Sequence, residues 1–221
     1  MTGRAEAAEQ AGAVQRPGPR LRVEPRQTRG QARIAAVLDA AERLLGRVDV
    51  DAVTTTRIAA EAQVAVGSVY RYFPDKEAIF DALAARYLAE FEALMDQLTE
   101  HAAEEKWGDP VGVLVDAYAD HYRNRPALRA IWFGAGLSKT LFEADRRHKR
   151  TMAAGIARLL VTLGVTEDAE RVATPSYAGM LAADALIQEA FRSDPAGDAE
   201  LLEAAKVLLR AYLTALVVPP T

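Results

Sequence analysis

The sequence contains no cysteine and no long apolar run. The absence of cysteine excludes a disulfide framework and a thiolate metal site. No apolar segment of the kind that marks a secretory signal follows the N-terminus, and the longest apolar stretches, such as residues 130–137, are too short to span a bilayer. Half of the 221 residues are nevertheless apolar, which is enough for the core of one or two small domains. We therefore expect a soluble, cytoplasmic protein without a membrane partner.

Charge is distributed unevenly along the chain. The net charge is −4, but residues 1–80 sum to +2 and residues 81–221 to −6. Between Arg16 and Arg33 there are six arginines and a single acidic residue, Glu24. Positive charge at one end is typical of a surface that attracts nucleic acid, although a solvated tail has the same composition.

Residues 1–27 are predicted to form a disordered basic arm, because three prolines between residues 17 and 25 disfavour a helix. Arg20, Arg22 and Arg26 have the chemistry to enter a DNA minor groove. The alternative, which we favour, is a flexible tail that adds only non-specific attraction.

From Thr28 onward, apolar residues recur at intervals of three and four, as in amphipathic helices. No segment reads as a convincing strand, and residues 47–53 are interpreted as a loop. The sequence therefore predicts an all-α fold in two unequal parts, a small N-terminal domain of residues 28–75 and a larger α-helical domain of residues 76–221. The expected helices cover residues 28–46, 55–62, 66–73, 75–100, 110–123, 126–133, 138–163, 167–193 and 198–217.

Residues 54–83 carry the most specific pattern of the chain, TTTRIAAEAQVAVGSVYRYFPDKEAIFDAL. A hydroxyl of Thr55 or Thr56 can cap the first free amides of a short helix. A second short helix follows after a tight turn, Pro74 stops it, and Asp75 is well placed to start the next. Two short helices joined in this way outline a helix-turn-helix, whose second helix enters the DNA major groove.

The second of these helices presents residues suited to DNA. Val69 and Phe73, four residues apart, are expected to pack on the core, which leaves the polar side chains to other faces. Small residues at the start of the helix let the backbone approach the bases, Arg71 can donate two hydrogen bonds to guanine or grip a phosphate, and tyrosines can stack on bases or donate to phosphates. The expected contacts are Thr55, Thr56, Val66, Gly67, Ser68, Tyr70, Arg71, Tyr72 and Lys76.

The threonine cap, the alanine-rich first helix and the segments GSVYRYF and PDKEAIF together resemble the TetR family of transcriptional regulators, over residues 29–83. The resemblance implies a three-helix head and a fourth helix that links it to an effector-binding and dimerisation domain. By matching positions, Thr55 and Thr56 begin the first helix of the motif. Val66, Gly67, Ser68 and Arg71 then face bases, whereas Tyr70, Tyr72 and Lys76 face phosphates.

Two positions depart from the family pattern. Gln63 stands in the turn where the family usually has glycine, and Val50 lies near the position of a second glycine. A left-handed backbone at Gln63 costs a residue other than glycine about 1 kcal/mol. Either the turn relaxes or the strain is tolerated.

The larger domain offers a candidate dimer surface. Its last helix carries a broad stripe of apolar residues between Leu201 and Leu216, and the helix before it has small residues between Ala173 and Ala183. Two such helices can pack against their symmetry mates as a four-helix interface, which the resemblance also implies. Burial within one subunit is the alternative. We expect a homodimer, because two heads about 34–36 Å apart read a palindromic DNA operator.

An effector pocket is expected to be apolar with a few polar groups. Asp184 and Gln188 lie one turn apart on an otherwise apolar helix and are candidates to meet a polar group of the ligand. For each aromatic candidate, a place in the core is the alternative. The candidates are Tyr118, His121, Tyr122, Trp132, Phe133, Phe142, Tyr177, Met180, Asp184 and Gln188.

The function that we predict is a sequence-specific DNA-binding regulator, a repressor that a small hydrophobic ligand releases from double-stranded DNA. An enzyme is not expected, because His101, His121 and His148 are scattered, and His148 lies among basic residues as on a solvated face. We predict no cofactor and no metal site. The alternative is an α-helical ligand- or partner-binding protein without specific DNA recognition.

Overall fold

The computed structural model describes residues 28–105, 107–134 and 138–217. These residues form nine α-helices and no strand, so the all-α prediction is confirmed. The predicted basic arm, with Arg20, Arg22 and Arg26, lies outside the described residues. Within the described ranges, no helix is both long and apolar enough to cross a membrane.

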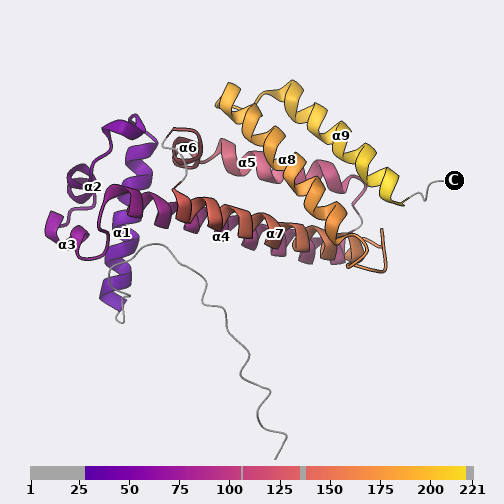
Figure 1. Ribbon diagram of the computed structural model, residues 1–221, viewed down its shortest axis with the longest axis horizontal. Helices are drawn as coiled ribbons and strands as arrows, with labels where there is room; N and C mark the ends of the chain where they lie inside the picture. Colours follow the sequence, from indigo (N-terminus) through magenta and orange to yellow (C-terminus); the bar gives the residue numbers. More distant parts are fainter. Residues whose placement is uncertain (1–27, 106, 135–137, 218–221) are drawn as a thin grey trace, which may run out of the picture.

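The first three helices form the head of the molecule. They are α1 (Thr28–Leu45), α2 (Thr55–Glu61) and α3 (Val66–Tyr70), with a short 3-10 turn at Val50–Ala52 between the first two. Figure 1 shows them gathered at one end, with α2 and α3 on the side away from the remaining helices. Val37, Ile58, Val69 and Phe73 are fully buried between them, as the apolar spacing predicts for the last two.

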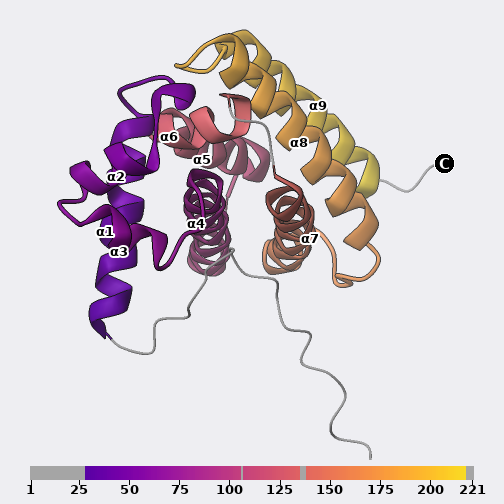
Figure 2. The same cartoon turned by 60° about the vertical axis from the view of Figure 1, so that its left-hand side comes forward.

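The longest helix, α4 (Lys76–Glu104), starts in the head and runs through the rest of the protein, the body. It lies side by side with α7 (Lys139–Thr162), as Figure 2 shows close to end-on. The two helices approach closely at Gly155, where an added Cβ would lie 2.5 Å from Cγ of Met95. Because Gly155 has no side chain, α7 packs directly against Met95 of α4 at this point.

The remaining helices complete the body. They are α5 (Pro110–Arg123), α6 (Pro126–Arg129), α8 (Ala173–Ser193) and α9 (Ala199–Val217). Figures 1 and 2 show α8 and α9 as an antiparallel pair on the side of the body farthest from the head.

Two predicted helices differ from the structure. The helix expected at residues 126–133 is split into α6 and a π-helical turn, Ala130–Gly134. The helix expected from residue 167 begins at Ala173 instead. Pro175 explains this start, because proline lacks a backbone N–H and is tolerated only in the first turn of a helix.

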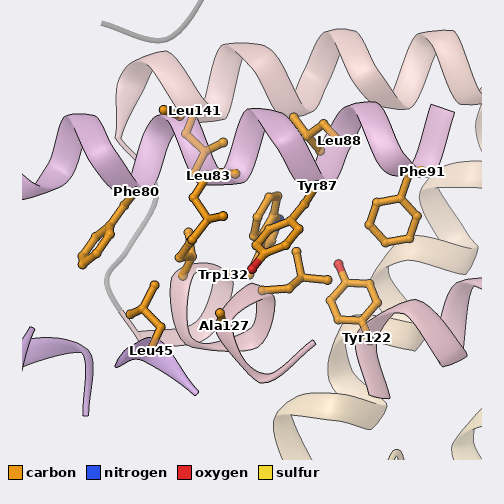
Figure 3. Close-up of a cluster of buried hydrophobic side chains, with 14 of the residues drawn as sticks. Leu45, Phe80, Leu83, Tyr87, Leu88, Phe91, Tyr122, Ala127, Trp132 and Leu141 are labelled. Atoms are coloured by element: carbon orange, nitrogen blue, oxygen red, sulfur yellow. The ribbon is translucent and has the colours of Figure 1, made fainter. Parts of the chain in front are cut away.

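Head and body share one continuous hydrophobic core. Figure 3 shows its central part, in which Leu45 of α1 and Leu83 of α4 lie near Ala127 of α6. Trp132 lies beside Tyr87 in the same cluster. The apolar contacts therefore run without a break from the head to the outer helices.

An ion-pair network lies along the same junction. Arg86 of α4 places one guanidinium nitrogen 2.6 Å from Glu42 of α1, and the Tyr87 hydroxyl donates to the same carboxylate at 2.9 Å. Arg125, at the start of α6, lies 2.6 Å from Glu90 and 3.6 Å from Glu42. Burial, together with the charge of Glu42, raises the pKa of Tyr87 well above its usual range. One carboxylate of the head is thus bound by side chains of the body.

Candidate nucleic-acid interface and ligand cavity

The cap of the first helix of the motif lies one residue earlier than predicted. Thr54 is the cap, and its hydroxyl accepts a hydrogen bond of 3.2 Å from the backbone N–H of Arg57. The expectation that Thr55 or Thr56 caps the helix is therefore wrong. With this start Thr55 turns toward the core and is buried, whereas Thr56 is exposed.

The turn between α2 and α3 keeps the left-handed residue of the family pattern. Gln63 has φ of +57°. Its N–H bonds to the carbonyl of Ala60 at 3.1 Å, and the N–H of Val64 bonds to the carbonyl of Ala59 at 3.0 Å. These two bonds close a Schellman motif, in which glycine usually occupies the left-handed position. Of the two alternatives, the turn tolerates the strain rather than relaxing.

The second helix, α3, and its C-terminal cap expose three of the residues expected to face DNA, Gly67, Tyr70 and Arg71. Tyr70 is 44% exposed and Arg71 is exposed. Gly67 is exposed, and an added Cβ would meet nothing within 4 Å. Val66 and Ser68 are half-buried. A surface that is open at its glycine and flanked by Arg71 and Tyr70 suits the approach of a phosphate backbone.

The end of α3 differs from the prediction. The helix stops at Tyr70, not at Phe73. Phe73 is excluded from it because the residue before a proline avoids the helical region. Tyr72 is only 6% exposed, so the expectation that it lies away from the core is wrong. Its ring belongs to the hydrophobic core, with the Arg71 guanidinium 5.9 Å from the ring centroid. A phosphate contact by Tyr72 remains a prediction.

The next helix begins beside this surface. The Asp75 carboxylate accepts a hydrogen bond of 2.7 Å from the backbone N–H of Ala78 and so caps α4. Lys76, the first residue of α4, is half-buried, with its ammonium 6.0 Å from the centroid of the Phe80 ring. The capped start of α4 thus places one cation next to the motif, and its contact with phosphate stays a prediction.

A cavity of about 100 Å³ lies in the body, between α5, α7, α8 and α9, with Met95 of α4 in its wall. Of the ten candidates for ligand binding, the structure places Tyr118 and Met180 in this wall. Sequence reasoning missed most of the remaining wall residues, among them Leu160, Ser176 and Leu213. The apolar periodicity of α9 places Leu213 on the apolar face of that helix. It does not reveal which neighbouring helix Leu213 faces.

The other aromatic candidates lie elsewhere. Tyr122 stacks on Phe191 with ring centroids 5.5 Å apart and faces Phe133 at 6.2 Å, inside the core. Trp132 belongs to the core cluster of Figure 3. Phe142, in the first turn of α7, is exposed. These residues do not line the cavity, because packing between helices directs their rings to other neighbours.

His121 and Tyr177 also lie outside the cavity wall. The His121 ring packs on Phe91 with centroids 4.1 Å apart. Burial and, after it, the charge of Arg125 lower the pKa of His121 to about 4. Tyr177 is half-buried, with the Arg150 guanidinium 5.9 Å from its ring centroid.

Asp184 and Gln188 are engaged with each other and with α7. The Gln188 amide donates to Asp184 at 2.8 Å, and the Lys149 ammonium lies 2.8 Å from Asp184 and 2.7 Å from Asp145. Burial alone would lower the pKa of Lys149, but the two carboxylates outweigh it and raise that pKa. These groups therefore form a paired polar cluster, and neither Asp184 nor Gln188 belongs to the cavity wall.

His148 is buried, and the expectation of a solvated face is wrong. Its Nδ1 lies 3.3 Å from a Glu92 carboxylate oxygen, and its Nε2 lies 3.5 Å from the Tyr118 hydroxyl. Of the basic residues around it in the sequence, Arg146, Arg147 and Arg150 are exposed, whereas His148 is buried. Within the described residues, no group of three or more histidine, aspartate or glutamate side chains could hold a metal ion.

A helix-turn-helix at one end of an α-helical body with an apolar cavity between its helices defines a DNA-binding transcriptional regulator. The family model for bacterial regulatory proteins of the tetR family matches residues 37–83. The model for the tetracyclin repressor-like C-terminal domain matches residues 105–217. The chain belongs to the TetR family.

Solved structures agree with this assignment. A TetR-family transcriptional regulator from Streptomyces coelicolor is 33% identical, with 83% of this chain and 99% of that chain covered and a TM-score of 0.58. SmeT in complex with triclosan is 20% identical (86% and 97% covered, TM-score 0.57). The TetR family repressor AlkX from Dietzia sp., implicated in biodegradation of n-alkanes, is 14% identical (85% and 99% covered, TM-score 0.54). The last two show likeness of fold alone. No curated protein matches the sequence.

Proposed function

We propose that the protein is a cytoplasmic repressor, that it binds a palindromic double-stranded operator as a homodimer, and that a small apolar ligand releases it. Residues 28–75 are the DNA-binding domain and residues 76–221 the effector-binding and dimerisation domain. The observation that carries the proposal is the course of α4. Its first residue, Lys76, adjoins the helix-turn-helix, while Met95 on the same helix forms part of the cavity wall.

In this proposal the cavity and the DNA-binding surface are coupled by linkage, and the ligand favours release of DNA. A ligand that fills the cavity displaces Met95 or its neighbours, and α4 transmits the shift to the head through the shared core and the ion pairs around Glu42. A coupling free energy of roughly 1–3 kcal/mol weakens DNA binding about 5- to 150-fold, which is sufficient for induction. Two proteins of the same fold support an apolar effector. SmeT forms a complex with triclosan, and AlkX is implicated in the biodegradation of n-alkanes.

Dimerisation is assigned to the outer face of α8 and α9. Leu181 of α8 and Val207, Leu208 and Tyr212 of α9 are exposed, with Val207 63% and Leu208 51% accessible. Other members of the predicted α9 stripe, such as Leu209, are buried within the subunit. Exposed apolar side chains on one helix pair are typical of an interaction surface, and a twofold axis would pair them as a four-helix interface.

The experiment that tests the proposal is selection from a random DNA library, with sedimentation of the free protein. We expect a palindromic consensus and a dimer. Leu208→Glu should give monomers that lose the consensus, while Val113→Glu, at an exposed valine of α5, should leave both unchanged. A monomeric wild type, or no enrichment of any sequence, would support the alternative of a helical binding protein without specific DNA recognition.

A further inference from the structure

The cavity wall contains very few polar groups. Of the described residues that line it, none is charged, and the only side-chain hydroxyls belong to Tyr118, Ser176 and Tyr212. Tyr212 is more than one third exposed in the single chain and belongs to the face proposed for dimerisation, so its hydroxyl is not confined to the cavity. The Tyr118 hydroxyl lies 3.5 Å from Nε2 of His148 and has a partner there.

Ser176 is different from both tyrosines. The residue is 4% exposed, and its Oγ has no hydrogen-bond partner within the described part of the chain. A buried hydroxyl without a partner is unfavourable, and most buried polar groups of proteins are paired. A water molecule is a poor partner here, because a buried water needs two to four polar neighbours and this wall is apolar almost throughout.

From this we infer the chemical class of the effector, an inference that rests on the proposed function. The ligand is a neutral apolar molecule with one hydroxyl or carbonyl group, and that group hydrogen-bonds to Ser176 Oγ. A serine hydroxyl both donates and accepts, so it can pair with either group.

Charged effectors are excluded on the same grounds. An ionised carboxylate or ammonium that enters this cavity loses its hydration and gains no counter-ion, which is strongly unfavourable. The charged side chains on the neighbouring helices, Lys149, Asp145 and Asp184, are paired with one another and do not line the cavity.

The size of the cavity limits the ligand as well. An apolar cavity of about 150 Å³ accommodates benzene, so a volume of about 100 Å³ fits one ring or a short alkyl chain with small movements of its wall.

The test uses three probes that share the toluene skeleton and measures their affinity for the full chain by calorimetry at pH 7. The probes are p-cresol (a neutral phenol), toluene (its apolar analogue) and p-toluate (an anion). We expect p-cresol and toluene to bind the wild type and p-toluate not to bind. Ser176→Ala should weaken p-cresol about three- to tenfold, the range of one neutral hydrogen bond, and leave toluene unchanged.

Two control variants make the result specific. Thr162→Val removes a helix hydroxyl that bonds to the carbonyl of Arg158, outside the cavity wall, and should change no affinity. Met180→Trp fills the cavity and should abolish binding of both neutral probes. This loss would show that the probes bind in the cavity. Thermal unfolding verifies that each variant is folded, and Ser176→Ala is expected to be at least as stable as the wild type.

The outcomes separate the inference from the proposal on which it rests. If toluene and p-cresol bind and Ser176→Ala weakens neither, the assignment of Ser176 is overturned and the ligand cavity stands. Tight binding of p-toluate would overturn the exclusion of charged ligands. Failure of both neutral probes, or their binding to Met180→Trp, would overturn the inference together with the ligand part of the proposed function.

Discussion

Replacing Gln63 by glycine should stabilise the protein, and replacing Gly164 by glutamine should destabilise it. The two residues occupy the same place in the same motif, at the ends of α2 and α7, with φ of +57° and +71°. At the end of α7 the two hydrogen bonds of the Schellman motif are both 2.9 Å long. The N–H of Gly164 donates to the carbonyl of Val161, and the N–H of Val165 donates to the carbonyl of Leu160. The chain therefore contains a matched pair that differs in whether the left-handed residue has a side chain.

The magnitude follows from two opposing terms. A left-handed conformation costs a residue with Cβ about 1–2 kcal/mol. Glycine opposes this gain, because it raises the entropy of the unfolded chain and so lowers the free energy of unfolding by about 0.4–1 kcal/mol. Gln63→Gly should thus raise the free energy of unfolding by about 0.5–1 kcal/mol. At Gly164 an added Cβ meets nothing within 4 Å, so Gly164→Gln should lower it by a similar amount through the backbone alone.

The assay is urea unfolding at one fixed protein concentration, because association changes the apparent stability. Gln97→Gly serves as the control, since Gln97 is an exposed residue inside α4, where glycine destabilises by about 1 kcal/mol. The reasoning would be refuted if Gln63→Gly destabilised the protein as much as Gln97→Gly does.

Three further predictions concern the cap, a buried histidine and the junction. Thr54→Ala should cost about 1 kcal/mol in urea unfolding through loss of the α2 cap, whereas Thr56→Ala should change stability by less than about 0.5 kcal/mol. Because burial and Arg125 hold the pKa of His121 near 4, below its ordinary value, neutral His121 favours folding above pH 6.5. That contribution should disappear as the pH falls from 6.5 to 4, and His121→Phe should show a smaller decrease in melting temperature over this range. Arg125→Met should cost about 1–2 kcal/mol, less than a fully buried pair because its side chain is 35% exposed. A double-mutant cycle with Glu90→Gln should show strong coupling, and simple additivity would contradict the ion pair.

The sequence was sufficient to predict the elements whose signals are local. Proline at the start of α5, the Asp75 cap of α4 and the apolar spacing of Val69 and Phe73 each act within one or two helical turns, and the structure confirms them. The Thr54 cap was missed by one residue because three consecutive threonines have the same capping chemistry. The start of α8 was missed because an apolar pattern continues upstream of Pro175.

The cavity could not be predicted in the same way, because it depends on which helices face each other. Asp184 and Gln188 were interpreted as ligand groups, but their partner Lys149 comes from α7, and no pattern within α8 reveals it. His148 was misread for the same reason, since its partners Glu92 and Tyr118 lie on other helices. No sequence pattern singles out Ser176. It stands out only in the structure, because its buried Oγ has no hydrogen-bond partner among the described residues.

The central claim, sequence-specific DNA binding through α3, is tested most directly by fluorescence anisotropy on the palindrome selected from a random library. The wild type should bind with nanomolar affinity. Arg71→Ala should bind at least about tenfold more weakly, consistent with the loss of one bidentate contact to a base. Arg146→Ala, at an exposed arginine of α7, should bind like the wild type. Equal losses in both arginine variants, or weak binding without sequence preference that salt abolishes, would contradict the account.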